Sequence, residues 1–241
     1  MSYVSYPEGD LWRCRVDGSE KLQLTSSPLS VDLARWSPDG REIAIEATEP
    51  AQRPRAYIIP AEGGTLRKLN AGQFDIFLAG WDADGTAITF NDLSEVGHST
   101  IRSFDLKTMQ TTDVPGSASL MSPMRSPDGK YLVATTVAGD KSMLFDFSNQ
   151  KWTELAKTTV GSQAWSADSK FVYFDNGFST DQAIYRVRIL DHKIEQVAGL
   201  KDFRRVVTPW NTWFGLTPEG APLLMHDVGS QEVYALDLAT E

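Results

Sequence analysis

Five acidic residues recur along the chain, and a ring of carboxylates is the first pattern in it that suggests chemistry. They are Asp39, Asp84, Asp128, Asp168 and Glu219. Carboxylate oxygens are the ligands that Ca²⁺ prefers. Each of these residues, however, follows a Ser, Thr or Asp by two positions, in a segment where a tight turn favours an acidic residue for its own hydrogen bonds. We therefore expect turns here and no metal site.

Histidines and one acidic loop are the other candidate metal ligands. His98, His192 and His226 lie far apart in the sequence and lack the spacing of metal-ligating histidines. The loop Asp175-Asn176-Gly177, with Asp181, lacks the full twelve-residue calcium pattern. The chain also has no glycine-rich phosphate loop, so we predict neither a metal nor a cofactor.

A serine nucleophile of the α/β-hydrolase type requires a Gly-x-Ser-x-Gly turn. The chain contains no such motif. Its nearest approaches, Gly161-Ser162 and Gly177-Phe178-Ser179, are typical of loops. We therefore expect a protein that is not an enzyme.

The elements that position these residues follow a repeat. Five segments share a Trp-Ser-Pro-Asp-Gly pattern: residues 36–40, 81–85, 125–129, 165–169 and 216–220. Proline fixes φ at the first central position of the turn in three of them, alanine replaces it in two, which weakens those turns, and the acidic residue takes the second position. Glycine then accepts a positive φ. Ser169 replaces this glycine and predicts a differently shaped or strained turn.

Short strands surround each turn. An apolar strand follows it directly, as in Ile43-Ala44-Ile45, and a third strand contains a large residue such as Tyr57 or Tyr185. A fourth, more polar strand closes the unit, as expected for an edge. Four strands in a unit of about 40 to 50 residues are typical of a propeller blade. We predict blades over residues 31–70, 76–114, 118–156 and 160–198.

The two ends supply the remaining strands. The chain begins with a second, third and fourth strand (residues 3–24) and finishes with a first, second and third (residues 206–238). The fold class predicted is an all-β propeller, residues 1–241 forming one domain with six blades of four antiparallel strands. The alternative is five blades, with residues 21–24 closing the last and the first hairpin left over. The missing opening strand also suggests part of a longer chain.

Residues 36–40, followed by an apolar strand and a tyrosine-containing strand, resemble the TolB-like propeller repeat. The resemblance covers residues 3–238 and implies a propeller. Residues 3–9 and 233–238 look like the corresponding segments of propellers that follow a CadC-like regulator domain or a serine/threonine kinase domain in bacterial signalling proteins. This resemblance favours a periplasmic or other extracytoplasmic location and leaves a cytoplasmic one open.

Charge and hydropathy exclude two kinds of partner. The net charge of −9 argues against nucleic acid, which requires clustered Lys and Arg. No apolar run approaches the length of a membrane span, so we expect a soluble segment without membrane contact.

Function is predicted from the loops around the channel mouth of the propeller, where arginine and large aromatic residues interrupt the repeat and are suited to anchor a partner. The predicted partner-binding residues are Arg53, Arg55, Phe74, His98, Phe178, Arg204, Arg205 and Trp210. We predict a non-catalytic sensor or scaffold module of a bacterial signalling protein, which binds an unidentified protein or small molecule there. The alternative is a metal-dependent propeller hydrolase or the access-gating propeller of a protease.

Overall fold

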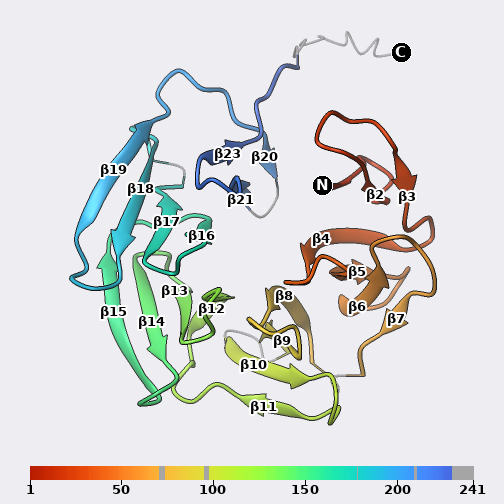
Figure 1. Cartoon of the computed structure of the whole chain (residues 1–241), viewed down its shortest axis with the longest axis horizontal. Helices are drawn as coiled ribbons and strands as arrows, with labels where there is room; N and C mark the ends of the chain where they lie inside the picture. The colour runs from red at the N-terminus through yellow and green to blue at the C-terminus, as the bar shows by residue number, and fades with distance from the viewer. Residues whose placement is uncertain (71–73, 95–97, 178, 209–210, 230–241) are drawn as a thin grey trace, which may run out of the picture.

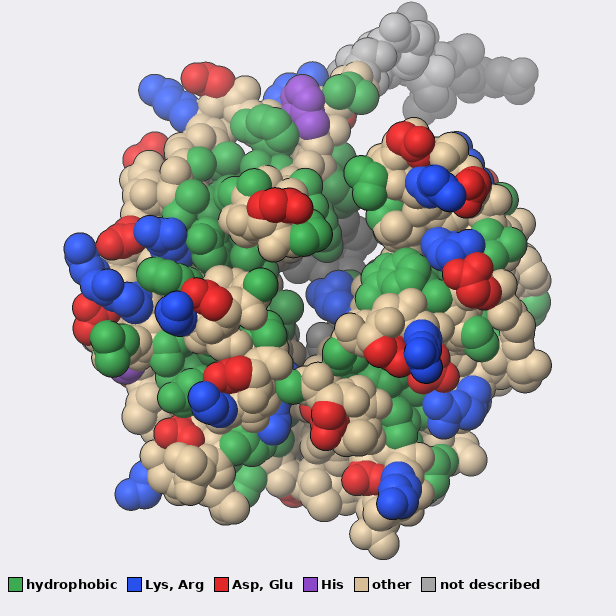
Figure 2. Space-filling view, viewed as in Figure 1, with side chains coloured by type: hydrophobic (Ala, Val, Ile, Leu, Met, Phe, Trp, Pro, Cys, Tyr) green, Lys and Arg blue, Asp and Glu red, His purple; other side chains and the backbone are tan. Residues whose placement is uncertain are grey.

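The computed structural model describes residues 1–70, 74–94, 98–177, 179–208 and 211–229, and these residues form strands, turns and loops without a helix. The strands gather into antiparallel sheets arranged radially about a central axis (Figure 1). Figure 2 shows a hollow at the centre of this face, with a Lys or Arg side chain visible inside it. The all-β propeller fold is thereby confirmed.

Four consecutive sheets have four strands each, in chain order from the axis to the periphery (Figure 1). The first comprises β4 (Ser30–Trp36), β5 (Glu42–Thr48), β6 (Arg55–Pro60) and β7 (Arg67–Lys68). The second comprises β8 (Ile76–Trp81), β9 (Ala87–Asp92), β10 (Thr100–Asp105) and β11 (Thr111–Asp113). The third comprises β12 (Leu120–Arg125), β13 (Tyr131–Thr136), β14 (Lys141–Asp146) and β15 (Lys151–Lys157). The fourth comprises β16 (Gln163–Trp165), β17 (Phe171–Asp175), β18 (Ala183–Arg188) and β19 (Ile194–Gly199). All four blades lie where the repeat predicts them.

The repeated turn joins the first and second strands of each of these blades, as expected. In the first blade Trp36 pairs with Ile43, and the amide of Gly40 donates to the carbonyl of Ser37 at 2.9 Å. Gly40 has φ +70°, and the other three glycines of the motif are also at positive φ. Ser169 closes its turn with the same hydrogen bond to Ser166, 3.0 Å, at φ +58°. The turn therefore keeps its shape, and the serine takes the strained conformation.

The acidic residues of the motif serve the turns. Asp39 accepts hydrogen bonds from the hydroxyl of Ser37 at 2.7 Å and from the amide of Arg41 at 3.0 Å. Asp168 accepts equivalent bonds from Ser166 and Lys170. The serine hydroxyl, and then the backbone amide, hold the pKa of each carboxyl below its ordinary value. The turn role predicted for these carboxylates is confirmed for Asp39, Asp84, Asp128 and Asp168.

The tryptophans of the motif connect neighbouring sheets. Trp81 is buried, and its indole Nε1 donates to the carbonyl of Arg35, in the preceding blade, at 3.0 Å. Trp165 donates in the same way to the carbonyl of Met124 at 2.8 Å. Each indole thus combines apolar burial with a satisfied N–H group and packs between two blades.

The apolar cores also lie between blades. One cluster contains Val133 and Leu144 of the third sheet together with Val172 and Phe174 of the fourth, all at most 5% exposed. Similar clusters join the other neighbouring blades. Because each blade covers one face of the next, the stability of one depends on its neighbours.

The prediction of six blades is wrong: the described residues form five, the number given as the alternative, although residues 22–23 pair with residues 12–13 and do not close the last blade. The fifth is an N-terminal three-stranded sheet of β1 (Ser2–Val4), β2 (Leu11–Arg13) and β3 (Leu22–Gln23). Residues after the fourth blade form two short hairpins, one of β20 (Val207–Thr208) and β21 (Asn211–Thr212), the other of β22 (Phe214–Leu216) and β23 (Pro222–Leu224). A turn motif at 216–220 shows that two strands pair, but it does not show how many further strands join them. The predicted last strand, around Tyr234, lies outside the described residues.

Candidate functional site

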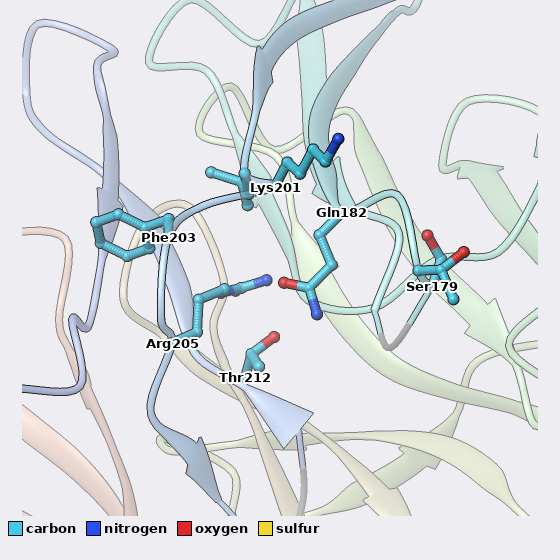
Figure 3. Close-up of a pocket in the computed structure, with 8 residues that line it drawn as sticks. Ser179, Gln182, Lys201, Phe203, Arg205 and Thr212 are labelled. Atoms are coloured by element: carbon cyan, nitrogen blue, oxygen red, sulfur yellow. The ribbon is translucent and has the colours of Figure 1, made fainter. Parts of the chain in front are cut away.

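A pocket of about 340 Å³ opens beside the fourth blade, at its junction with the C-terminal hairpins. One wall is the loop between β17 and β18, and the other is the segment that follows β19. Its lining residues are Ser179, Thr180, Gln182, Leu200, Lys201, Phe203, Arg205 and Thr212. Figure 3 shows the side chains of Gln182 and Arg205 pointing toward one another across it. Hydroxyls, an amide, two cations and an apolar wall therefore surround a single opening.

Asn176 gives the first wall its shape. Its side-chain amide donates to the hydroxyl of Ser179 and to the carbonyl of Asp181, both at 2.8 Å. Its carbonyl oxygen accepts from the amide of Ala183 at 2.9 Å. The side chain of Asn176 thus supplies hydrogen bonds to backbone groups of the loop and holds Ser179 at the rim.

A buried ion pair holds the second wall. Arg205 donates through Nη2 to Oδ2 of Asp175 at 2.6 Å, and the two side chains are 2% and 0% exposed. Asp175 also accepts from the hydroxyl of Thr212 at 3.2 Å and from the amides of Ser162 and Gly177. The C-terminal segment is therefore anchored to the end of β17 through one fully satisfied carboxylate.

The backbone strengthens this junction. Arg205 forms a β-bridge with His226, and the amide of Asp227 donates to the carbonyl of Arg204 at 2.9 Å. The ring of His226 stacks on Phe203 at 4.7 Å between centroids. The position of Arg205 at the base of the pocket is thus fixed by both backbone and side-chain contacts.

Three of the predicted binding residues form one cluster elsewhere. Arg53 pairs with Asp75 at 2.6 Å, and Nη1 of Arg55 donates to the carbonyl of Phe74 at 2.5 Å. The guanidinium of Arg102 lies over the ring of Phe74, 4.2 Å from its centroid. The structure therefore brings Arg53, Arg55 and Phe74 together, with both of these arginines engaged by partners within the chain.

The other five predicted residues are distributed differently. His98 is exposed, and Arg204 is exposed and pairs with Asp227 at 2.8 Å. Arg205 lines the pocket from beneath, so our expectation of a free loop arginine is corrected: its side chain is buried against Asp175. Phe178 and Trp210 lie outside the described residues. Whether any of the eight binds a partner remains a prediction.

The loops singled out from the sequence include both loops that line the pocket, but most of the lining residues were not among the predicted ones. Residues 175–182 and 201–210 interrupt the repeat, which is the signal that identified them. Within these loops we favoured arginine and aromatic residues and passed over Ser179, Gln182 and Lys201. Serine, glutamine and lysine are common in every loop, so the types of these three residues alone did not indicate a site.

Among the residues that the structure describes, no three His, Cys, Asp or Glu side chains gather as a metal site would require. Over the same residues there is no helix long and apolar enough to cross a membrane.

No family model matches the chain. Among curated proteins, it is 32% identical over 154 residues to the uncharacterized peptidase YuxL of Bacillus subtilis, covering 62% of this chain and 22% of that protein. It is 30% identical over 96 residues to tricorn protease homolog 1 of Streptomyces coelicolor, covering 39% of this chain and 9% of that protein. The chain thus spans less than a quarter of the length of these relatives.

These relatives contradict the expectation that the protein is not an enzyme, because both are named as peptidases or proteases. The chain is similar to peptidase-related propellers. The absence of a Gly-x-Ser-x-Gly motif misled the prediction, since a peptidase can carry its nucleophile outside the propeller. No comparison bears on the resemblance to CadC-like regulators and kinases, which stays a prediction.

Among solved structures, TolB from Acinetobacter baumannii superimposes with a TM-score of 0.71 at 19% identity, over 90% of this chain and 58% of that one. At this identity the likeness concerns the fold. The chain is therefore a β-propeller of the TolB-like fold.

Proposed function

We propose that this chain is the propeller of a peptidase and that it binds peptide segments and controls their access to the hydrolytic site. The observation that carries the proposal is the 32% identity to a protein named as a peptidase. The matched stretch covers 62% of the chain, a length of several blades, so the shared part includes much of the propeller.

The pocket beside the fourth blade supports this function because it suits a peptide. A peptide segment presents backbone N–H and C=O groups and apolar side chains together. The pocket offers hydroxyls and an amide, as at Ser179 and Gln182, next to the apolar surface of Leu200 and Phe203. Such a combination of apolar wall and few polar groups is typical of a ligand site.

The test is hydrolysis of fluorogenic peptides of increasing length by the natural polypeptide that contains residues 1–241. We expect cleavage, and we expect Phe203→Ala to raise KM for peptides with little change in kcat, because the wall contributes equally to ground-state and transition-state binding. Leu190→Ala is the matched control, since Leu190 is 88% exposed and lies outside the pocket.

Two results contradict the proposal. One is the absence of both peptide cleavage and peptide binding by the purified protein. The other is an unchanged KM in Phe203→Ala for every peptide, in a variant whose melting temperature shows that it is folded.

A further inference from the structure

Charge is distributed unevenly around the pocket. Its lining contains two cations, Lys201 and Arg205, and no Asp or Glu, although the chain as a whole has a net charge of −9. Asp181 and Asp202 lie in the same two loops, but neither lines the pocket. Asp175 balances the charge of Arg205 from beneath, which leaves Lys201 as the cation in the lining with which an anion can pair.

Arg205 has hydrogen-bonding capacity that its protein partners leave unused. Its Nη2 donates to Asp175 and, at 3.2 Å, to the carbonyl of Trp213. Its Nε and Nη1 are buried and have no hydrogen-bond partner among the described residues. A buried donor without an acceptor is unfavourable, so a ligand oxygen that reaches it is stabilised more than the same oxygen at an exposed arginine.

Asp175 does not supply the missing acceptor. Its Oδ1 already accepts from the amides of Ser162 and Gly177, and its Oδ2 from Arg205 and Thr212. With both oxygens occupied, this carboxylate stabilises the charge of Arg205 and leaves the remaining donors for another acceptor.

Gln182 lines the pocket next to Arg205. Its side-chain amide faces the guanidinium in Figure 3, and its backbone carbonyl accepts from the amide of Leu200 at 2.7 Å. The backbone contact fixes the residue, while the side chain retains rotatable bonds. Because Nε and Nη1 of Arg205 are buried, a ligand oxygen can reach them only if a neighbouring side chain moves, and Gln182 is the side chain that faces them; we refer to it as the cover.

We propose that the pocket binds a carboxylate, held by the ammonium group of Lys201 at its rim and by the unpartnered N–H groups of Arg205 at its base. Charge-assisted hydrogen bonds of this kind are the stronger ones in proteins. The inference rests on the proposed function in one respect: the carboxylate is taken to belong to a peptide, at its C-terminus or on an acidic side chain.

The experiment titrates the natural protein with four probes and follows binding by calorimetry. They are acetyl-Ala-Ala with a free carboxylate, its C-terminal amide, the amide of acetyl-Asp-Ala, and succinate. We expect the three carboxylates to bind and the uncharged amide to bind far more weakly, with affinity falling as salt is added because the interaction is between charges.

Lys201→Ala is expected to weaken binding of the free-acid dipeptide by roughly threefold to tenfold through the loss of a charge-assisted hydrogen bond. Lys193→Ala is the matched control: it removes an exposed positive charge from the same blade that does not line the pocket, and it should leave affinity unchanged. Gln182→Ala should bind at least as tightly as the unmodified protein, because the cover is removed. These variants avoid Arg205, whose loss affects folding.

The other outcomes separate failure of the carboxylate inference from failure of the peptidase proposal. Equal binding of the acid and the amide, or equal effects of Lys201→Ala and Lys193→Ala, overturns the carboxylate inference while leaving a peptide-binding propeller intact. Binding of succinate without either peptide acid keeps the carboxylate site and contradicts the peptidase proposal. No binding of any carboxylate overturns the inference.

Discussion

Asp175 and Arg205 show how one pair of residues can support both a fold and a site. They are 30 positions apart, and their ion pair connects the end of β17 to the segment that begins the C-terminal hairpins. Gly161 lies directly against the same carboxylate, since a Cβ there would come 2.0 Å from its Oδ1. The base of the pocket is therefore as closely packed as a core.

Replacing Arg205 with alanine should reduce the free energy of unfolding by about 3–5 kcal/mol, because it leaves the buried carboxylate of Asp175 without its counter-charge. The measurement is the urea midpoint at neutral pH.

Arg204→Ala is the control for that experiment. The Arg204 side chain is 60% exposed, and an exposed ion pair contributes at most about 1 kcal/mol. If the two single variants are equally stable, the buried pair does not have the role assigned to it.

At the scale of elements, the repeated turn is the unit that builds each blade. Its serine, acidic residue and glycine form a closed set of hydrogen bonds with the backbone, and the tryptophan before it reaches the neighbouring sheet. The turn is thus specified locally, while the tryptophan ties it to the next blade.

Gly40→Val should destabilise the protein by about 1–2 kcal/mol through backbone strain alone. A Cβ at this position meets no atom within 4 Å apart from its chain neighbours, so a clash of the Cβ with other parts of the protein does not contribute to the loss. Gly40→Asn is the matched variant and should lose less, because asparagine tolerates left-handed φ. Equal losses for both, measured by chemical denaturation, contradict backbone strain as the cause.

The turn carboxylates should make stability fall in acid. The pKa values of Asp39 and Asp168 are lower in the folded chain than in the unfolded one, so the unfolded state binds more protons as pH falls. Their contribution is present above the ordinary pKa of about 3.9 and is lost as pH drops through the folded values.

The corresponding measurement compares urea midpoints of the unmodified protein and of Asp39→Asn with Asp168→Asn, from neutral pH into acid. The double variant should be less stable near neutrality and should show a shallower acid dependence. An identical acid dependence in both proteins contradicts the role given to these carboxyls.

For the whole molecule, the position of the cores decides how it unfolds. Phe174 is fully buried at the interface of the third and fourth blades, where it packs beside Val133 and Leu155 of the preceding sheet. A blade therefore loses part of its own core when its neighbour unfolds, and cooperative behaviour across blades is the expected consequence.

Phe174→Ala should reduce stability by about 3–5 kcal/mol, as for other large-to-small core replacements. Unfolding should remain a single transition, with tryptophan fluorescence and far-ultraviolet circular dichroism giving the same midpoint. Phe171→Ala is the control and should lose less, because that ring is only partly buried and lies under the Arg186 guanidinium. Separate transitions for the two probes contradict coupling through the cores.

The sequence by itself determined the blades and their turns. Trp36 to Gly40 and its repeats specify a turn through hydrogen bonds and φ angles within a few residues, so type and spacing were sufficient to place four blades. The alternation of apolar residues then assigned most strands, because a strand with one buried face has a period of two.

Only the tertiary structure decided the number of blades and the nature of the site. How many strands join residues 206–224, and whether Arg205 meets Asp175 or solvent, depend on side chains that the chain brings together from distant positions. The sequence shows an arginine in a long loop in either case. Once the side chain of Arg205 is buried, it can no longer be solvated by water, and a buried ion is stable only beside a counter-charge. That buried environment exists only after the blades have packed.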